Sequence, residues 1–273
     1  MSRIDEKLKS LKADKRKALV IFLTAGDPSL SASLDLALCA FDAGADIVEL
    51  GAPFSDPLAD GPVIQKSFLR SIGKGTNLKK TLSLAEKIRK INENPLVIML
   101  GSTLVINHGT GRFMRDCASS GVDGLIIPDA PLEEAGEFTG KAKKAGLNMI
   151  MLAAPTSTPS RLRKICSMSR GFVYYINVSG VTGGTPGASG ALATHTNKIV
   201  KPIARLKKLT SLPVLAGFGV KTPAQARALC KTADGVIIGS KAIEIIHSEK
   251  SKASAVKALA KFVRSVRRKM DRG

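Results

Sequence analysis

The stretch ELGAPFSDPLAD, residues 49–60, places a glutamate where a short apolar run should end and an aspartate eleven positions later. Between Glu49 and Asp60 lie two prolines, a glycine and a third carboxylate, Asp56. Ionised carboxylates cost free energy in apolar surroundings. Packing alone therefore does not explain a glutamate at the end of a buried strand, and Glu49 indicates a strand that opens into a polar site.

The apolar run that ends at this glutamate is one of eight along the chain. Each run has the length of a buried strand and is apolar throughout instead of alternating, which is typical of a parallel sheet covered on both faces. The predicted strands are Ala18–Thr24, Ile47–Leu50, Leu96–Leu100, Gly124–Ile127, Asn148–Ala153, Phe172–Asn177, Pro213–Ala216 and Gly235–Ile238.

Helical patterns alternate with these runs. Ser31 and Ser33 are the candidate caps of the first helix. The predicted helices are Leu30–Ala43, Leu78–Ile91, Thr110–Ser120, Pro131–Ala145, Pro159–Met168, Thr194–Leu209, Pro223–Cys230 and a final helix from Ser251 to Arg272. Two further helices, Ile4–Lys12 and Pro62–Ile72, stand outside the alternation.

Strand and helix in strict alternation predict an α/β fold, a TIM (β/α)8 barrel, in one domain over residues 1–273. It would carry an extra N-terminal helix and a helical insertion after strand 2. A doubly wound open sheet is the alternative, but such sheets usually have about five or six strands, and no GxGxxG follows the first strand here. In a barrel the catalytic groups lie at the carboxyl ends of the strands, and Glu49 occupies such an end.

The charge of the chain is strongly basic, with 42 Lys and Arg against 22 Asp and Glu and a net charge of +20. Such a surface attracts anions. The chain has two Tyr, no Trp and no RNA-binding motif, which argues against a nucleic-acid site. No signal peptide and no apolar run of the ~20 residues needed to span a bilayer is visible, so we expect a cytoplasmic protein without membrane contact.

Glycine-containing turns follow the last two predicted strands, GFG at Gly217–Gly219 and IGS at Ile238–Ser240. Barrels often bind phosphate at these two loops through backbone amides and a short helix N-terminus. The segment SGVTGGTPGASG, Ser179–Gly190, is long and rich in glycine, and we expect it to act as a lid over the ligand.

The acids offer proton-transfer chemistry. A carboxyl group such as Glu49 in a partly apolar pocket has a raised pKa and can donate and accept a proton. Asp60 fits a catalytic role and an ordinary turn before glycine about equally. No lysine ends a strand, which argues against a Schiff base, and the scattered histidines argue against zinc. The three acids of the quoted stretch could in principle hold Mg²⁺. The rigid prolines between them are equally consistent with acids that are fixed in place for proton transfer.

The longer motif ELGAPFSDPLADGPVIQ (Glu49–Gln65) closely resembles the signature of the tryptophan synthase α subunit family. The resemblance implies retro-aldol cleavage of indole-3-glycerol phosphate to indole and glyceraldehyde 3-phosphate. It also implies that indole passes to a β subunit with its own PLP in an αββα assembly, with no cofactor in this chain. Five further matches keep the family order: FLTAGDP (Phe22–Pro28), GVDGLIIPD (Gly121–Asp129), SGVTG (Ser179–Gly183), GFGV (Gly217–Val220) and IGS (Ile238–Ser240).

The resemblance also assigns roles to residues. Glu49 matches the general acid/base, Asp60 the acid that hydrogen-bonds the indole N–H, and Tyr174 a pocket residue near Glu49. Asp56 would face the β subunit. The implied substrate-binding positions are Phe22, Thr182, Gly183, Phe218, Gly219, Gly239 and Ser240.

Two segments depart from the family pattern. Gly101, Ser102 and Thr103 stand where the family usually has an aromatic residue and an asparagine after strand 3. The lid continues as VTGGTPGASG instead of VTGAR. These departures keep other functions open: a weakened subunit that mainly activates a β partner, or a stand-alone lyase that releases indole. A different phosphate-binding barrel, such as a sugar-phosphate isomerase, is a further alternative.

Overall fold

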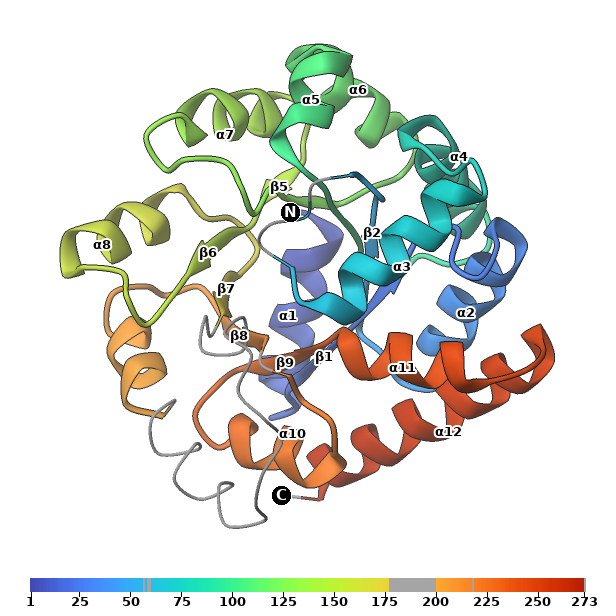
Figure 1. The fold of residues 1–273 in the computed structure, drawn as a ribbon. Coiled ribbons are helices and arrows are strands. Elements are labelled where there is room, and N and C mark those ends of the chain that lie inside the picture. Colours follow the sequence, from blue (N-terminus) through green and yellow to red (C-terminus); the bar gives the residue numbers. More distant parts are fainter. Residues whose placement is uncertain (56, 58–59, 177–199, 218, 273) are drawn as a thin grey trace.

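The computed structural model describes residues 1–55, 57, 60–176, 200–217 and 219–272, and within these residues the strands form one parallel sheet curled into a barrel (Figure 1). The sheet order is β5-β4-β3-β2-β1-β9-β8-β7-β6. The strands are β1 (Ala18–Thr24), β2 (Ile47–Gly51), β3 (Leu96–Met99), β4 (Gly124–Ile126), β5 (Asn148–Met149), β6 (Met151–Ala153), β7 (Val173–Ile176), β8 (Val214–Gly217) and β9 (Gly235–Ile238).

The two ends of this sheet meet in a single segment. The predicted strand Asn148–Ala153 is interrupted at Ile150, so that β5 pairs with β4 and β6 pairs with β7. The Ile150 N–H still donates to the Leu125 carbonyl at 2.9 Å. One continuous stretch therefore joins the first and last strands of the order, and the predicted TIM barrel is confirmed.

Most of the helices surround the barrel, whereas α1 (Arg3–Ala13) lies across its centre in the view of Figure 1. The others are α2 (Leu30–Asp42), α3 (Pro62–Gly73), α4 (Leu78–Arg89), α5 (Ser102–His108), α6 (Thr110–Ser119), α7 (Ala135–Lys144), α8 (Pro159–Met168), α10 (Pro223–Cys230), α11 (Ser240–Ser248) and α12 (Lys252–Asp271). Residues 200–207 are also helical, and the beginning of the predicted helix Thr194–Leu209 lies outside the described residues. The N-terminal helix and the insertion after strand 2 were both predicted correctly.

Three details of the helix prediction were wrong. Ser29, not Ser31 or Ser33, caps α2, because its hydroxyl accepts the Ala32 N–H at 3.1 Å. The helices α5 and α11 were not predicted. Each begins shortly after a strand and has a glycine as its N-cap, Gly101 for α5 and Gly239 for α11. A glycine has no side chain that could accept a capping hydrogen bond. The usual Ser, Thr, Asp or Asn signal of a helix start is therefore absent at both.

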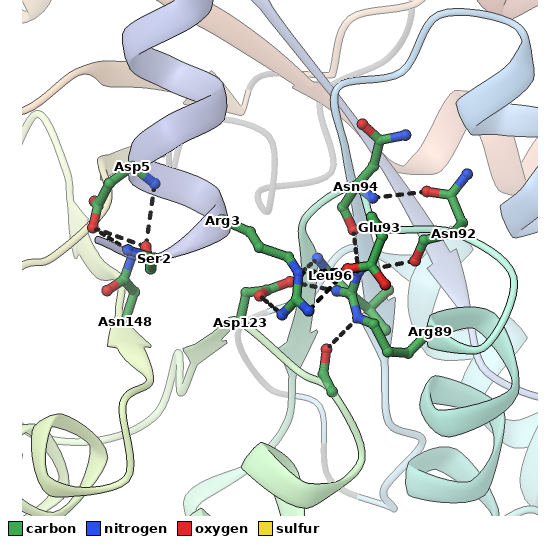
Figure 2. Close-up of polar contacts among 11 residues, drawn as sticks. Ser2, Arg3, Asp5, Arg89, Asn92, Glu93, Asn94, Leu96, Asp123 and Asn148 are labelled. Atoms are coloured by element: carbon green, nitrogen blue, oxygen red, sulfur yellow. Dashed lines mark hydrogen bonds and ion pairs between the residues drawn. The ribbon is translucent and has the colours of Figure 1, made fainter.

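The N-terminal helix α1 fills one end of the barrel. Ile4, Leu8 and Leu11 are buried in the same cluster as barrel residues such as Ile47 and Phe172. A polar network at the start of α1 holds it there, as Figure 2 shows. The Asp123 carboxylate accepts from Arg3 at 3.2 Å, from Arg89 at 2.6 Å and from the Leu96 N–H at 2.8 Å. The charged end of α1 is thus tied to the beginning of the strands.

Side chains of β2 alternate between two hydrophobic clusters. Ile47 belongs to the cluster inside the barrel, whereas Val48 and Leu50 pack in the outer cluster between strands and helices. Because successive side chains of a strand point to opposite faces, Glu49 faces the barrel interior. Its neighbours in register are Phe22 on β1 and Val97 on β3.

The last helix, α12, is anchored by a buried ion pair. The Arg267 guanidinium donates to Asp46 at 3.0 Å and to the Lys17 carbonyl at 3.0 Å, and the Asp46 carboxylate also accepts the Leu19 N–H at 2.8 Å. Both charged side chains are more than nine-tenths buried, with 7% and 8% exposed. The pair joins α12 to the beginnings of β1 and β2.

No helix within the described part of the chain combines the length and the apolar character needed to cross a membrane.

We expect Arg267→Met to lower the free energy of unfolding by about 3–5 kcal/mol, because Asp46 would keep a buried charge without its partner. Urea unfolding measures the change as a lower midpoint at unchanged slope. Arg268→Met, at an exposed position of the same helix, is the control and should change the midpoint little. Equal effects of the two substitutions would contradict the role of the ion pair.

Candidate active site

Glu49 is a buried carboxyl group inside the barrel. Its exposed fraction is 1%, and its Oε2 atom has no hydrogen-bond partner among the described residues. Burial first, and the charge of Asp60 second, raise the pKa of Glu49 to about 8. A carboxyl group with this pKa is mostly protonated at neutral pH and can both give and take a proton.

Asp60 lies in the β2–α3 loop, just before α3 begins. It is 9% exposed, and its Oδ2 atom has no partner within the described chain. Burial, followed by the charge of Asp129, raises the pKa of Asp60 to about 7. Because the charge of Asp60 also raises the pKa of Glu49, the two carboxyl groups lie in one site. The alternative that Asp60 is only a turn residue does not account for its burial.

Gln65 on α3 holds the backbone of the loop that carries Asp60. Its side-chain amide donates to the Asp60 carbonyl at 2.8 Å and to the Pro57 carbonyl at 3.2 Å. The Asp60 N–H donates to the same Pro57 carbonyl at 3.0 Å. Both backbone groups of Asp60 are therefore fixed. Gln65 closes the quoted motif, but nothing in its spacing indicated this role.

The inserted helix α3 is itself fixed to the end of β1 and to the loop that follows it. The hydroxyls of Thr24 and Ser67 lie 2.6 Å apart. Arg70 on α3 makes two hydrogen bonds to the buried Asp27 carboxylate, at 2.6 Å and 3.1 Å. Paired contacts of this kind between guanidinium and carboxylate are among the stronger ones in proteins. The insertion thus forms a rigid support for Asp60.

Tyr174 on β7 faces the same interior. It packs against the inner hydrophobic cluster and is partly buried. Gly217 on β8 makes room for it, since a Cβ atom there would lie 2.1 Å from the tyrosine ring. Burial, and then the charges of Glu49 and Asp60, raise the pKa of Tyr174 well above its usual value. All three predicted catalytic residues therefore share one site.

Asp129 orients backbone at the rim of the barrel. Its carboxylate accepts the Ser102 N–H at 2.8 Å and the Ser102 hydroxyl at 2.9 Å. Asp129 therefore stabilises the beginning of α5, although the helix that follows Asp129 in the sequence is α7. Its charge also reaches Asp60, whose pKa it raises.

The predicted phosphate loops lie partly within the described residues. Gly239 is the N-cap of α11, Ser240 is its first residue, and both are partly buried. Gly219 has φ of 30°, a conformation that favours glycine. The start of α11 presents backbone N–H groups and the positive end of the helix dipole, which suits an anion. Asp56, Thr182, Gly183 and Phe218 lie outside the described residues.

Three aromatic rings line one side of the interior. Phe22 is directly opposite Glu49 in register, and its ring centroid lies 6.5 Å from that of Phe68 on α3. The Phe68 centroid is 5.5 Å from that of Phe54 in the β2–α3 loop. Phe22 is a predicted site residue, whereas Phe54 and Phe68 were not predicted, because their contacts join segments that are distant in sequence.

This arrangement can perform carboxylate acid/base chemistry on a ligand that combines an apolar ring with an anionic group. Two carboxyl groups have raised pKa values, the aromatic Phe22 stands opposite Glu49 in register, and a helix N-terminus follows β9, the strand that pairs with β1 on its other side.

Comparison with known proteins gives one consistent result. The family model described as "Tryptophan synthase alpha chain" matches residues 8–271. The chain is 42% identical over 267 residues to the tryptophan synthase alpha chain of Geobacter sulfurreducens, with 98% of each chain covered. It is 42% identical over 240 residues to that of Geotalea daltonii, with 88% of each covered.

Solved structures agree with the sequence comparisons. Tryptophan synthase subunit alpha from Legionella pneumophila superposes with a TM-score of 0.90 at 32% identity, covering 100% of both chains. A chain of tryptophan synthase from M. tuberculosis, in an aminoacrylate-bound form, superposes with a TM-score of 0.87 at 30% identity, covering 99% of this chain and 100% of that one.

The buried carboxyl Glu49 has a measurable consequence for stability. Its pKa in the folded protein is about 8, against 4.5 in the unfolded chain. Folding therefore becomes less favourable as pH rises between these values, because the unfolded chain releases the proton first. We expect Glu49→Gln to match the parent near pH 5 and to be more stable by about 2–5 kcal/mol at pH 9.

Urea unfolding at the two pH values measures this difference. Glu249→Gln, at an exposed position, is the control: it retains Glu49, so its stability should differ from that of the parent by the same small amount at both pH values. A Glu49→Gln variant whose stability followed that of the parent at both pH values would show that Glu49 ionises normally.

Proposed function

The chain belongs to the tryptophan synthase alpha chain family, and we propose that Glu49, Asp60 and Tyr174 form its catalytic site. The protein is a lyase of tryptophan biosynthesis that cleaves indole-3-glycerol phosphate to indole and glyceraldehyde 3-phosphate. The observation that carries the assignment is the buried, inward-facing Glu49, whose pKa of about 8 makes it a proton donor at neutral pH.

Glu49 moves the protons of the reaction. Protonated Glu49 gives its proton to C3 of the indole, and the ring becomes positively charged. The electron pair of the breaking carbon–carbon bond enters this ring, the hydroxyl-bearing carbon becomes the aldehyde, and the hydroxyl proton returns to Glu49. The protonated indole is the electron sink, so the step requires no metal and no cofactor in this chain.

Asp60 and Tyr174 complete the site. Ionised Asp60 accepts a hydrogen bond from the indole N–H and stabilises the positive charge that develops on the ring. Its support by Gln65 keeps it in place for this contact. Tyr174 forms the wall beside Glu49, and its raised pKa keeps the phenol neutral.

The phosphate and the three-carbon chain bind at the other side of the site. Gly219, Gly239 and Ser240 receive the phosphate at the start of α11, where backbone N–H groups and the helix dipole favour an anion. Phe22 contacts the indole from β1. Thr182, Gly183 and Phe218 complete the substrate contacts in this proposal, and Thr182 belongs to the lid.

Proteins of this family work with a β subunit. We propose that this chain does so in a cytoplasmic αββα assembly, that PLP resides in the β subunit, and that the β2–α3 loop with Asp56 faces that partner. Indole then passes between the subunits. The stand-alone lyase is the rival function, since Gly101–Thr103 departs from the family pattern after β3.

We expect Glu49→Gln to lower turnover of indole-3-glycerol phosphate by about 100- to 10 000-fold, the usual contribution of a general acid or base. Affinity for glycerol phosphate should stay unchanged, because the phosphate contacts are intact. Indole release and calorimetric titration measure the two quantities. Retained turnover in this variant would show that another group moves the protons.

The pH dependence of kcat/KM should be bell-shaped with limbs near pH 7 and 8. Asp60 must be ionised and its pKa is about 7, whereas Glu49 must be protonated and its pKa is about 8. Asp60→Asn should lose the limb near pH 7 and move the other limb below pH 8, because the charge of Asp60 no longer raises the pKa of Glu49. A profile that rises through pH 9 would contradict the role of Glu49 as proton donor.

The partner proposal is tested by measuring indole release with and without a β subunit, together with the mass of the complex. We expect turnover to rise on addition of the β subunit and a mass of two copies of each chain. High turnover by the isolated chain, with no further increase, would support the stand-alone lyase. No turnover in either case would support a subunit that only activates its partner.

A further inference from the structure

Gly101 occupies an inward-facing position at the rim of the barrel. Val97 and Met99 on β3 belong to the inner cluster, whereas Ile98 and Leu100 belong to the outer one. Gly101 retains extended backbone angles, with φ of −73° and ψ of 145°. The alternation of the strand therefore continues past its end and turns position 101 toward the interior. A glycine there leaves this part of the wall without a side chain of its own.

The ring of Phe54 fills the space in front of Gly101. A Cβ atom at position 101 would lie 2.9 Å from Cε2, 3.0 Å from Cδ2 and 3.3 Å from Cζ of Phe54. Carbon atoms that are not bonded pack at about 3.5–4.0 Å, so any side chain at 101 would displace the ring. The phenylalanine therefore rests on the glycine backbone.

Phe54 is also held from the opposite side. Its centroid is 5.5 Å from that of Phe68 at an interplanar angle of 50°, and Phe68 contacts Phe22. Phe22 stands opposite Glu49 in the register of β1 and β2. The three rings thus form a column that begins at the level of Glu49 and ends with Phe54 at the rim, where Phe54 is partly exposed.

We propose that Phe54 is the aromatic wall of the indole pocket in this chain, and that Gly101 is the residue that permits it. The inference rests on the proposed function, since it requires Asp60 to bind the indole N–H. Phe54 and Asp60 belong to the same loop, six positions apart. An indole held at Asp60 then lies beside an aromatic surface that the loop itself provides.

This placement makes two substrate contacts depend on one segment. The apolar contact through Phe54 and the polar contact through Asp60 both come from the β2–α3 loop. On the other side, Gly101 is the N-cap of α5, whose first residue, Ser102, is held by Asp129. The loop therefore carries the specificity for an aromatic ring, whereas Gly101, after the end of β3, supplies the backbone surface against which Phe54 packs.

Phe54→Leu tests the proposal with two ligands. Indolepropanol phosphate carries the indole ring and the phosphate but cannot be cleaved, whereas glycerol 3-phosphate has no ring. We expect Phe54→Leu to bind indolepropanol phosphate about tenfold more weakly, from the loss of aromatic contact, and glycerol 3-phosphate unchanged within about twofold. In the cleavage of indole-3-glycerol phosphate, the KM of this variant should rise while its kcat stays within about threefold of the parent value. Phe262→Leu on α12, remote from the site, is the matched control.

Further variants test whether Phe54 contacts the indole ring or only supports the packing of the fold. Phe54→Ala should lose affinity for the ring-bearing ligand, and Phe54→Ala combined with Gly101→Phe should recover most of it, because the new ring enters the same space from β3. Gly101→Phe alone should weaken the ring-bearing ligand, since it displaces Phe54. Thermal unfolding of each variant accompanies the titrations.

Equal weakening of both ligands in Phe54→Leu would overturn the proposal, because a packing defect affects the whole site. Unchanged affinity for indolepropanol phosphate, or no recovery in the double variant, would also overturn it. These outcomes are distinguishable from failure of the proposed function: if only the wall is wrong, Glu49→Gln still loses turnover.

Discussion

The inward orientation of Glu49 is the constraint on which the site depends. The alternation of β2 sends Val48 and Leu50 to the helices and Glu49 to the interior. There Glu49 loses water, and the charge of a second carboxyl group, Asp60, raises its pKa further. The burial of Glu49 therefore destabilises the fold, and the same burial gives Glu49 a pKa at which it can donate a proton near neutral pH. Burial of apolar side chains elsewhere in the barrel, including those of α1 in the inner cluster, stabilises the fold against this cost.

The helical insertion after β2 serves the site as well as the fold. Asp60 lies in a connecting loop, and loops are usually the least rigid parts of a barrel. Here α3 is bonded to the end of β1 through Ser67 and to the loop after β1 through Arg70, and Gln65 extends from it to the Asp60 carbonyl. These contacts hold the backbone of Asp60, the acid that we propose binds the ring nitrogen, while the same loop remains at the surface expected to face a β subunit.

The sequence predicted much of the fold because parallel strands that are buried on both faces appear in the sequence as short, continuous apolar runs. β1, β9, α8 and α10 have the predicted bounds, and most other predicted elements differ from the structure by a few residues. It did not predict α5 and α11, since both begin at glycines without a capping side chain. Glu49 was recognisable from chemistry alone, whereas Asp60 was compatible with a turn until its burial was known. The roles of these residues in turnover remain predictions.

The sequence by itself determined the alternation of strands and helices, the acid at the end of β2 and the family, because these depend on composition, order and motif within continuous stretches. Tertiary structure decided which residues complete the site. Phe54 fills the space of Gly101, Gln65 holds Asp60, and Asp129 holds Ser102. Two of these three contacts join different loops of the barrel rim, and all depend on the distance between atoms after folding. From the sequence, the glycine at position 101 indicates that an aromatic side chain is missing from the pocket. In the folded chain, the ring of Phe54 from the neighbouring loop occupies that space.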